Sequence, residues 1–268
     1  MSCMKRRKQM SRNDSKRSEY EGMVYETNNY GTLVVTKYVN SHEVYVKFVN
    51  TGYEMKATMR DIKLGKVKDK FTPSVFFVGV VGNTPTRVNG IQTREYCLWR
   101  TMLQRCYDSK TQEVYPTYKG CTVSENFKSY TYFHEWCNKQ IGFDQEGWQL
   151  DKDILIKGNK VYSEDTCCFV PFEVNNIFTN RESVKGSYLI GVSLHKHSNK
   201  LRATLGVQGK QISLGYFEDE NEAHIAYKKA KEAHVRGLAD KYENLIDGRV
   251  YRILASYTLE NTFEGGVQ

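Results

Sequence analysis

A short stretch in the second half of the chain carries the side chains best suited to chemistry. It reads LDKDILIKGNKVYSEDTCCFVPFEVNN, residues 150–176, and begins with Asp151 and Asp153 on either side of Lys152. Because alternate residues of a strand point to one face, the two carboxylates could together hold one divalent metal ion. A purely structural alternative stays open, in which the aspartates cap a turn and the asparagines close a helix.

The lysine between the two carboxylates is a poor group for removing a proton from water. The reference pKa of a lysine side chain is about 10.4, so about one lysine in a thousand is deprotonated at neutral pH. A positive charge at Lys152 could hold a phosphate instead. Asp153, His134 and Tyr162 are then the alternative bases, in that order, although a lone histidine is more typical of a surface or packing residue.

Charge is unevenly distributed along the 268 residues, whose net charge is +8. Residues 1–20 carry +5, residues 21–94 carry +4, residues 95–180 carry −3 and residues 184–245 carry +3. Basic regions that flank an acidic middle suit a polyanionic partner. The alternative is that the excess charge serves solubility alone.

Several classes of protein are disfavoured by composition. The chain has no run of 18 apolar residues and no apolar core near its start, so we expect neither a membrane segment nor a signal peptide. Its seven cysteines form no CxxC pair, which predicts reduced thiols in a cytoplasmic protein rather than disulfides or a zinc knuckle. No motif for a small-molecule cofactor is present.

The first half of the chain divides into four parts by pattern. Residues 1–20 are polar and basic and are expected to be disordered. Short alternating runs over 21–75 predict a small antiparallel barrel of SH3-like size, and 76–94, rich in Gly, Pro and Asn, is expected to be a linker. Residues 95–140 predict helices with a buried face, with the following candidates: Leu98, Met102, Cys106, Phe127, Tyr130, Phe133, and Trp136 or Cys137.

The region 186–246 predicts three strands followed by one helix. Apolar residues alternate with polar ones in each strand, for example Leu201, Ala203 and Leu205 between Lys200, Arg202 and Thr204. The apolar sets can face the helix, which four alanines allow to approach closely: Ala223, Ala226, Ala230 and Ala233. The opposite face of the sheet is then polar and basic, as a solvated face or a DNA-reading face would be.

The segments IGVS, KLRATL, ISLGYF and EAHIAYKKA match, in order and spacing, the AP2/ERF DNA-binding domain, which this region resembles. Such domains occur in plant transcription factors and in mobile endonucleases, and their sheet lies in the major groove. The resemblance implies DNA contact by seven residues: Ser193, His195, Lys200, Arg202, Thr204, Lys210 and Gln211. Ser193 replaces a base-contacting arginine and Leu201 a tryptophan of the plant proteins, so sequence preference cannot be carried over.

Residues 95–182 resemble the HNH (ββα-metal) nucleases of phages. The resemblance lies in Trp99, Met102 and RCYD, in Phe127, Phe133 and Trp136, and in the stretch 150–176. It implies that Asp151 and Asn175 hold a divalent metal, Mg²⁺, and that Asn159 braces the turn. Lys152 stands where the family carries its histidine base, with Asp153 beside it.

The expected fold is therefore α+β and multidomain: an SH3-like barrel, an HNH-like module, an AP2/ERF-like sheet plus helix, and an extension over 247–268. The leading hypothesis is a homing-type DNA endonuclease of phage or mobile-element origin, acting on double-stranded DNA in a bacterial cytoplasm. The alternative is a non-catalytic DNA-binding regulator with a degenerate HNH scaffold. A protein that docks onto host machinery through the barrel is a third possibility, and protein partners stay unknown.

Overall fold

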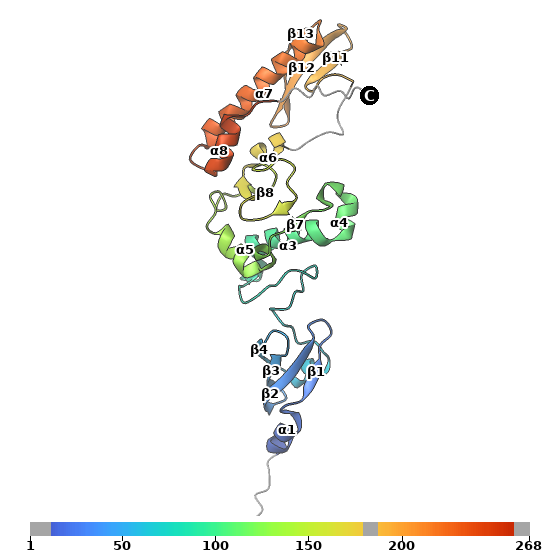
Figure 1. Ribbon diagram of the computed structural model, residues 1–268, viewed down its shortest axis with the longest axis vertical. Coiled ribbons are helices and arrows are strands. Elements are labelled where there is room, and N and C mark those ends of the chain that lie inside the picture. The colour runs from blue at the N-terminus through green and yellow to red at the C-terminus, as the bar shows by residue number, and fades with distance from the viewer. Residues whose placement is uncertain (1–11, 179–186, 260–268) are drawn as a thin grey trace, which may run out of the picture. The chain divides into compact units, whose positions relative to one another are not determined.

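The computed structural model describes residues 12–178 and 187–259, and confirms a mixed α+β fold with several separate sheets (Figure 1). The chain divides into two compact units, Met1–His134 and Glu135–Gln268, which are described separately. Residues 1–11, 179–186 and 260–268 lie outside the described residues; they include parts of the expected tail and extension, the end of the expected module 95–182 and the start of the expected region 186–246. No helix within the described ranges is long and apolar enough to cross a membrane.

The first unit begins with a helix and an antiparallel sheet. Its elements are α1 (Arg12–Tyr20), β1 (Val24–Glu26), β2 (Thr32–Asn40), β3 (Glu43–Phe48), β4 (Glu54–Ala57) and α2 (Met59–Lys63). The strands pair in the order β1-β2-β3-β4, and within the described chain β1 and β4 are unpaired edges. The expected closed barrel is therefore wrong: the sheet is open, and its buried face packs on the short helix α2 through Val44, Val46 and Ile62.

The helix α1 corrects the prediction that residues up to 20 are disordered. Tyr20 lies against the ring of Tyr38 at a centroid distance of 5.2 Å, and Arg17 forms an ion pair with Glu21 at 3.1 Å. The Glu21 carboxylate in turn accepts a hydrogen bond from the Tyr38 backbone N–H. These contacts with β2 stabilise a polar segment whose own sequence gives no periodic pattern.

The rest of the first unit consists of short elements around two helices. They are β5 (Arg87–Val88), β6 (Ile91–Gln92), α3 (Arg94–Tyr107), α4 (Ser109–Val114) and β7 (Thr122–Val123), with 3-10 turns at Pro116–Tyr118 and Asn126–Lys128 and then α5 (Tyr130–Cys137), where the two units meet. The expected aromatic stripe is buried from Phe127 to Cys137, and Trp99 joins it. Within the expected linker 76–94, Gly79 packs closely on α3, because a Cβ there would lie 2.5 Å from Leu103, whereas Phe77 and residues 87–92 are exposed.

The second unit holds two small sheets and, within the described residues, three helices after α5. Its elements are β8 (Gln149–Asp151), β9 (Val161–Tyr162), β10 (Cys168–Val170), α6 (Phe172–Phe178), β11 (Val192–His195), β12 (Lys200–Val207), β13 (Lys210–Phe217), α7 (Glu220–Tyr242) and α8 (Gly248–Ala255). The three strands and the helix expected over 186–246 are present, and α7 packs along the sheet β11-β12-β13 (Figure 1). Of the four alanines, Ala223 is fully buried, whereas Ala233 is exposed and does not face the sheet.

One hydrophobic core joins the two halves of this second unit. Ile154, Cys168 and Val174 pack against Val235 of α7 and Val250 of α8. The segment from 247 is therefore part of the core rather than an appended extension. The first half of α7 covers the sheet and its second half covers the region that carries residues 149–178.

Candidate functional site

The residues of the stretch 150–176 lie on two paired strands and a helix. Strand β8 pairs antiparallel with β10, with Asp151 opposite Cys168 and Gln149 opposite Val170, and α6 follows directly after Pro171. The paired strands β8 and β10 and the helix α6 form a ββα unit, and β9 lies between the two strands in the chain. Asn175 on α6 donates a hydrogen bond from Nδ2 to Gln149 Oε1 at 2.6 Å. Since Gln149 and Asp151 alternate on one face of β8, Asp151 and Asn175 lie on the same side of that strand.

Asp151 is the last residue of β8, and its side chain caps the turn that follows. Its Oδ1 accepts hydrogen bonds from the backbone N–H groups of Asp153 and Ile154, both at 2.7 Å. Burial raises the pKa of the Asp151 carboxyl, and these two bonds oppose that shift. The Oδ2 atom is outside both bonds, so the turn-capping role uses one carboxylate oxygen and leaves the other for a ligand.

Asp151 and Asp153 do not share a strand face as expected. Strand β8 ends at Asp151, and the chain turns at once through the two hydrogen bonds to Asp151 Oδ1. Asp153 points into solvent, with 47% of its side chain exposed, and pairs with Lys152. Alternation requires a continuing strand, and the turn removes it.

Lys152 is a buried structural residue in this loop, only 6% exposed. Its Nζ donates to Asp153 Oδ1 at 2.5 Å and to the backbone carbonyl oxygen of Asn159 at 2.8 Å. The ammonium also lies 5.7 Å from the centre of the Tyr162 ring, which is itself buried. Both hydrogen bonds hold Nζ inside the loop, so Lys152 fastens the loop and is badly placed to take a proton from water.

Asn159 spans the same loop from the other side. Its Nδ2 donates to the carbonyl oxygens of Lys152 at 2.8 Å and Val161 at 2.6 Å, and its Oδ1 accepts from the Val161 N–H at 3.1 Å. These are the contacts that a residue bracing the turn would make. The remaining candidate base, His134, belongs to the first unit, where its ring packs on Tyr130 and its Nε2 lies 3.7 Å from Glu95.

The donor set for a metal ion is small. Among the residues that the structure describes, no group of three or more His, Cys, Asp or Glu side chains is arranged to hold a metal. Asp151 and Asn175 would supply one carboxylate and one amide oxygen from the same side of β8. That pair suits a hard cation such as Mg²⁺, which keeps several waters and is often held by one or two protein oxygens plus a phosphate.

The second candidate site is the face of the sheet β11-β12-β13 that lies away from α7. In register, Ser193 pairs with Arg202 and Arg202 with Tyr216, and His195 pairs with Lys200. Cross-strand partners point to the same face, so these five side chains share the open face. Ala203 and Leu205 of β12 are buried on the helix side.

A β-bulge determines which side chains of β13 reach the open face. Ala203 pairs with Gly215 and Thr204 with Ser213, which leaves Leu214 as an extra residue. Gly215 takes a φ of +134° there. Because the extra residue reverses the alternation, Tyr216 turns to the open face and Phe217 to the helix side. Tyr216 is not among the residues expected from the sequence to contact DNA. The dipeptide Leu214-Gly215 before it is the sequence feature that could have indicated the bulge.

Six of the seven residues expected to contact DNA lie in the open row by register: Ser193, His195, Lys200, Arg202, Thr204 and Gln211. Lys210 pairs with Val207 at the end of the hairpin, in the row of the helix-facing residues, because the alternation puts it out of phase with Gln211. It is exposed, but it is not part of the open face.

The open face combines cations with an aromatic ring. The rings of His195 and Tyr216 lie 4.9 Å apart, and 49% of Tyr216 is exposed. The Nε of Arg202 is buried and has no hydrogen-bond partner in the described part of the chain. Lys200 forms an exposed ion pair with Glu218 at 2.8 Å, which contributes little and which a phosphate could replace.

Comparisons with protein-family models, with curated proteins and with solved structures gave no match for this chain.

Proposed function

We propose that this protein binds double-stranded DNA through the open face of the sheet β11-β12-β13. The observation that carries the proposal is the register of Ser193, Arg202 and Tyr216, which places a cation and a ring side by side on an uncovered sheet. A guanidinium can bond to phosphates or to the acceptor edge of guanine, and a two- or three-stranded sheet fits the major groove. The +3 charge of residues 184–245 supports a polyanionic partner.

The test is DNA affinity of the full chain as a function of salt. Arg202→Ala and Tyr216→Ala should each weaken binding about tenfold or more, which corresponds to 1–3 kcal/mol per contact. Lys229→Ala is the matched control, because Lys229 is an exposed lysine on α7, away from the open face. Equal affinities of Arg202→Ala and wild type at moderate salt would refute the assignment of this face.

A second candidate function is hydrolysis of DNA by the stretch 149–178, as in a homing-type endonuclease of phage or mobile-element origin. The observation that favours it is the ββα order with Asp151 and Asn175 on one side of β8, and with the loop braced by Asn159. A divalent ion bound there would stabilise charge on the scissile phosphate and its leaving oxygen. Asp153, which is exposed beside Lys152, is the residue of this loop best placed to accept a proton from solvent.

The contacts of Lys152 favour the rival hypothesis of a DNA-binding regulator that retains the ββα unit as a scaffold. The experiment is incubation of long double-stranded DNA with wild type, Asp151→Ala and Asn175→Ala in the presence of Mg²⁺ or Mn²⁺. Cutting by wild type that both variants lose supports the endonuclease. DNA that stays intact while it is bound supports the regulator. Asn176→Ala, an exposed neighbour on α6, controls for damage to the helix.

A further inference from the structure

The segment 66–70 of the first unit carries lysines on every second residue. Its sequence is Lys-Val-Lys-Asp-Lys, in which Val67 is 3% and Asp69 1% exposed while the three lysines are exposed. The alternation of buried and exposed side chains shows that Lys66, Lys68 and Lys70 project to one side. In an extended segment such side chains follow one another at about 6.6 Å.

The two buried residues fix this segment to the domain. Val67 packs in the core of the sheet β1-β2-β3-β4. Asp69 accepts hydrogen bonds from the Thr51 hydroxyl at 2.5 Å, the Phe71 N–H at 2.8 Å and the Thr72 hydroxyl at 2.9 Å. The negative charge of Asp69 is thereby directed inward, and the lysine row is held in one orientation.

The row lacks compensating charge. Lys66 and Lys68 have no ion pair with any residue of the described ranges, and Lys70 lies 6.0 Å from the Tyr53 ring. Other lysines of this domain have ion pairs: Lys47 pairs with Glu54 at 3.1 Å and Lys56 pairs with Glu43 at 3.8 Å. A set of fixed, uncompensated cations is a site for a partner with regularly repeated negative charge.

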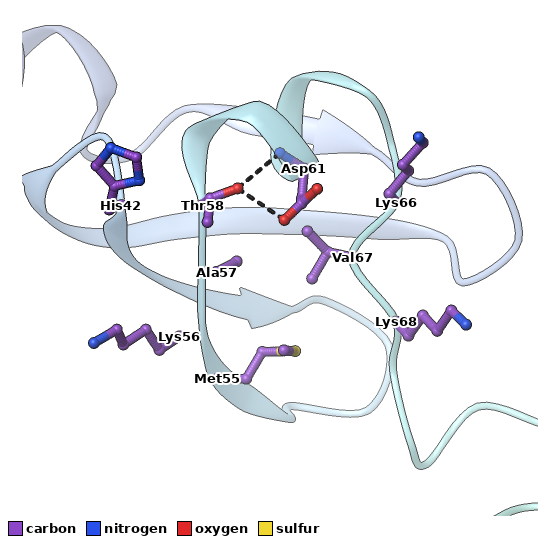
Figure 2. A pocket seen from close by; sticks show the side chains of 9 residues that line it. All are labelled: His42, Met55, Lys56, Ala57, Thr58, Asp61, Lys66, Val67 and Lys68. Atoms are coloured by element: carbon purple, nitrogen blue, oxygen red, sulfur yellow. Dashed lines mark hydrogen bonds between the residues drawn. The ribbon is translucent and has the colours of Figure 1, made fainter.

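A shallow pocket of about 400 Å³ extends the basic surface beside the row. Figure 2 shows Lys66 and Lys68 along one side of it, and His42 and Lys56 on the other. The one acidic residue that lines the pocket, Asp61, is turned toward Thr58, whose hydroxyl donates to it at 2.8 Å. The wall with Lys66 and Lys68 is therefore basic, whereas Lys56 on the other wall pairs with Glu43 at 3.8 Å.

We infer that Lys66, Lys68 and Lys70 form a second DNA contact, in which the first unit binds the phosphate backbone of the duplex. The inference rests on the proposed DNA-binding function and adds a separate site to it. A lysine ammonium acts as a point charge, so the row would bind the phosphate backbone of DNA without recognising particular bases. Two contacts on one chain raise affinity because the second binding event is intramolecular.

The experiment measures the dissociation constant of the full chain for a long duplex at a series of salt concentrations. The triple variant Lys66→Gln, Lys68→Gln, Lys70→Gln should lower the slope of log K against log salt by about 2.7, since each phosphate contact contributes about 0.9. The matched control replaces Lys37, Lys47 and Lys63 by Gln, which removes the same charge from the same domain. Its slope should stay within about 0.5 of wild type.

The outcomes separate this inference from the proposed function. An unchanged slope in the row variant overturns the inference, and it is the result expected if the lysine row binds an acidic protein instead of DNA. An equal fall of the slope in both triple variants also overturns it. Arg202→Ala could bind DNA like wild type while the row variant shows the lower slope of log K against log salt. That result would refute DNA contact by the open sheet face and support DNA contact by the lysine row. Absence of DNA binding by wild type overturns both. Equal urea midpoints of the three chains show that folding is unaffected.

Discussion

Lys152 and Asn159 each donate a hydrogen bond to the main-chain carbonyl oxygen of the other, and both bonds measure 2.8 Å. This reciprocal pair closes the loop between β8 and β9 without any strand pairing of the residues in between. The charge of Lys152 and the amide of Asn159 are therefore parts of one structural element.

Asn159→Ala should destabilise the protein by about 2 kcal/mol, because it removes three hydrogen bonds and leaves the partly buried carbonyl group of Lys152 without this donor, while the carbonyl group of Val161 keeps the Thr166 hydroxyl. The free energy of unfolding in urea measures the effect. Asn176→Ala, at an exposed position of α6, should change the value by no more than about 0.5 kcal/mol. Equal stabilities of the two variants would contradict the bracing role.

Lys152→Met should cost about 1–2 kcal/mol of stability, because the apolar stem is kept while the donor to Asp153 and Asn159 is lost. Lys139→Met, at an exposed position, is the control. If wild type cuts DNA, folded Lys152→Met should still cut it. Loss of cutting in a variant that is fully folded at the assay temperature would instead assign Lys152 a role in the chemistry.

The acid sensitivity of the second unit should depend on Glu173. Burial alone would raise the pKa of this carboxyl, but hydrogen bonds from Lys241, Tyr242 and Gln208 outweigh it and lower the pKa to about 2. A carboxyl whose pKa is lower in the folded state contributes stability above its unfolded value of 4.5, and that contribution is lost as pH falls toward 2.

Unfolding of wild type and Glu173→Gln should therefore be compared between pH 7 and pH 2. The difference in stability should be largest at neutral pH and should shrink through this acid range. Glu146→Gln, at an exposed position, controls for the loss of one carboxylate. A difference that stays constant with pH would show that the hydrogen bonds to Glu173 do not favour its ionised form.

Gly191→Ala should destabilise the sheet that carries the proposed DNA contacts. Gly191 has a φ of +83°, and a Cβ there would lie 2.1 Å from the Tyr227 ring. We expect a loss of about 3 kcal/mol from backbone strain and overpacking together. Gly209→Ala separates the two causes, because its φ is +78° but no atom lies within 4 Å of the added Cβ. The free energy of unfolding of Gly209→Ala should fall by about 1 kcal/mol. An equal fall in both variants would show that contact with the Tyr227 ring adds nothing at Gly191.

The alternation in β12 was predictable from sequence because that strand continues through eight residues and keeps its period. The same rule failed at Asp153, where β8 ends two residues earlier, and at Tyr216, where the bulge adds Leu214. The first departure comes from the turn that the Asp151 side chain makes with the next backbone N–H groups, and the second from the cross-strand register of Thr204 with Ser213. A local period contains no information about where such a register changes.

The helical stripe around Phe133 was predictable for the same reason, whereas α1 was not. The polar residues of α1 are ordered by Tyr38 and by the bond between Glu21 and the β2 backbone, and neither is visible in a window of sequence. The open sheet of the first unit is a similar case. Alternating runs predict strands, but closure into a barrel depends on which edges meet.

The helix α7 has a consequence for how this chain could have been assembled and recombined. Its first half belongs to the sheet and its second half, with Val235 and Ala239, belongs to the core around Val174. A gene fusion or transplant that cut near residue 186 would carry away a wall of the ββα unit along with the sheet. A donor sheet domain would therefore have to bring a helix whose far end fits the core around Val174.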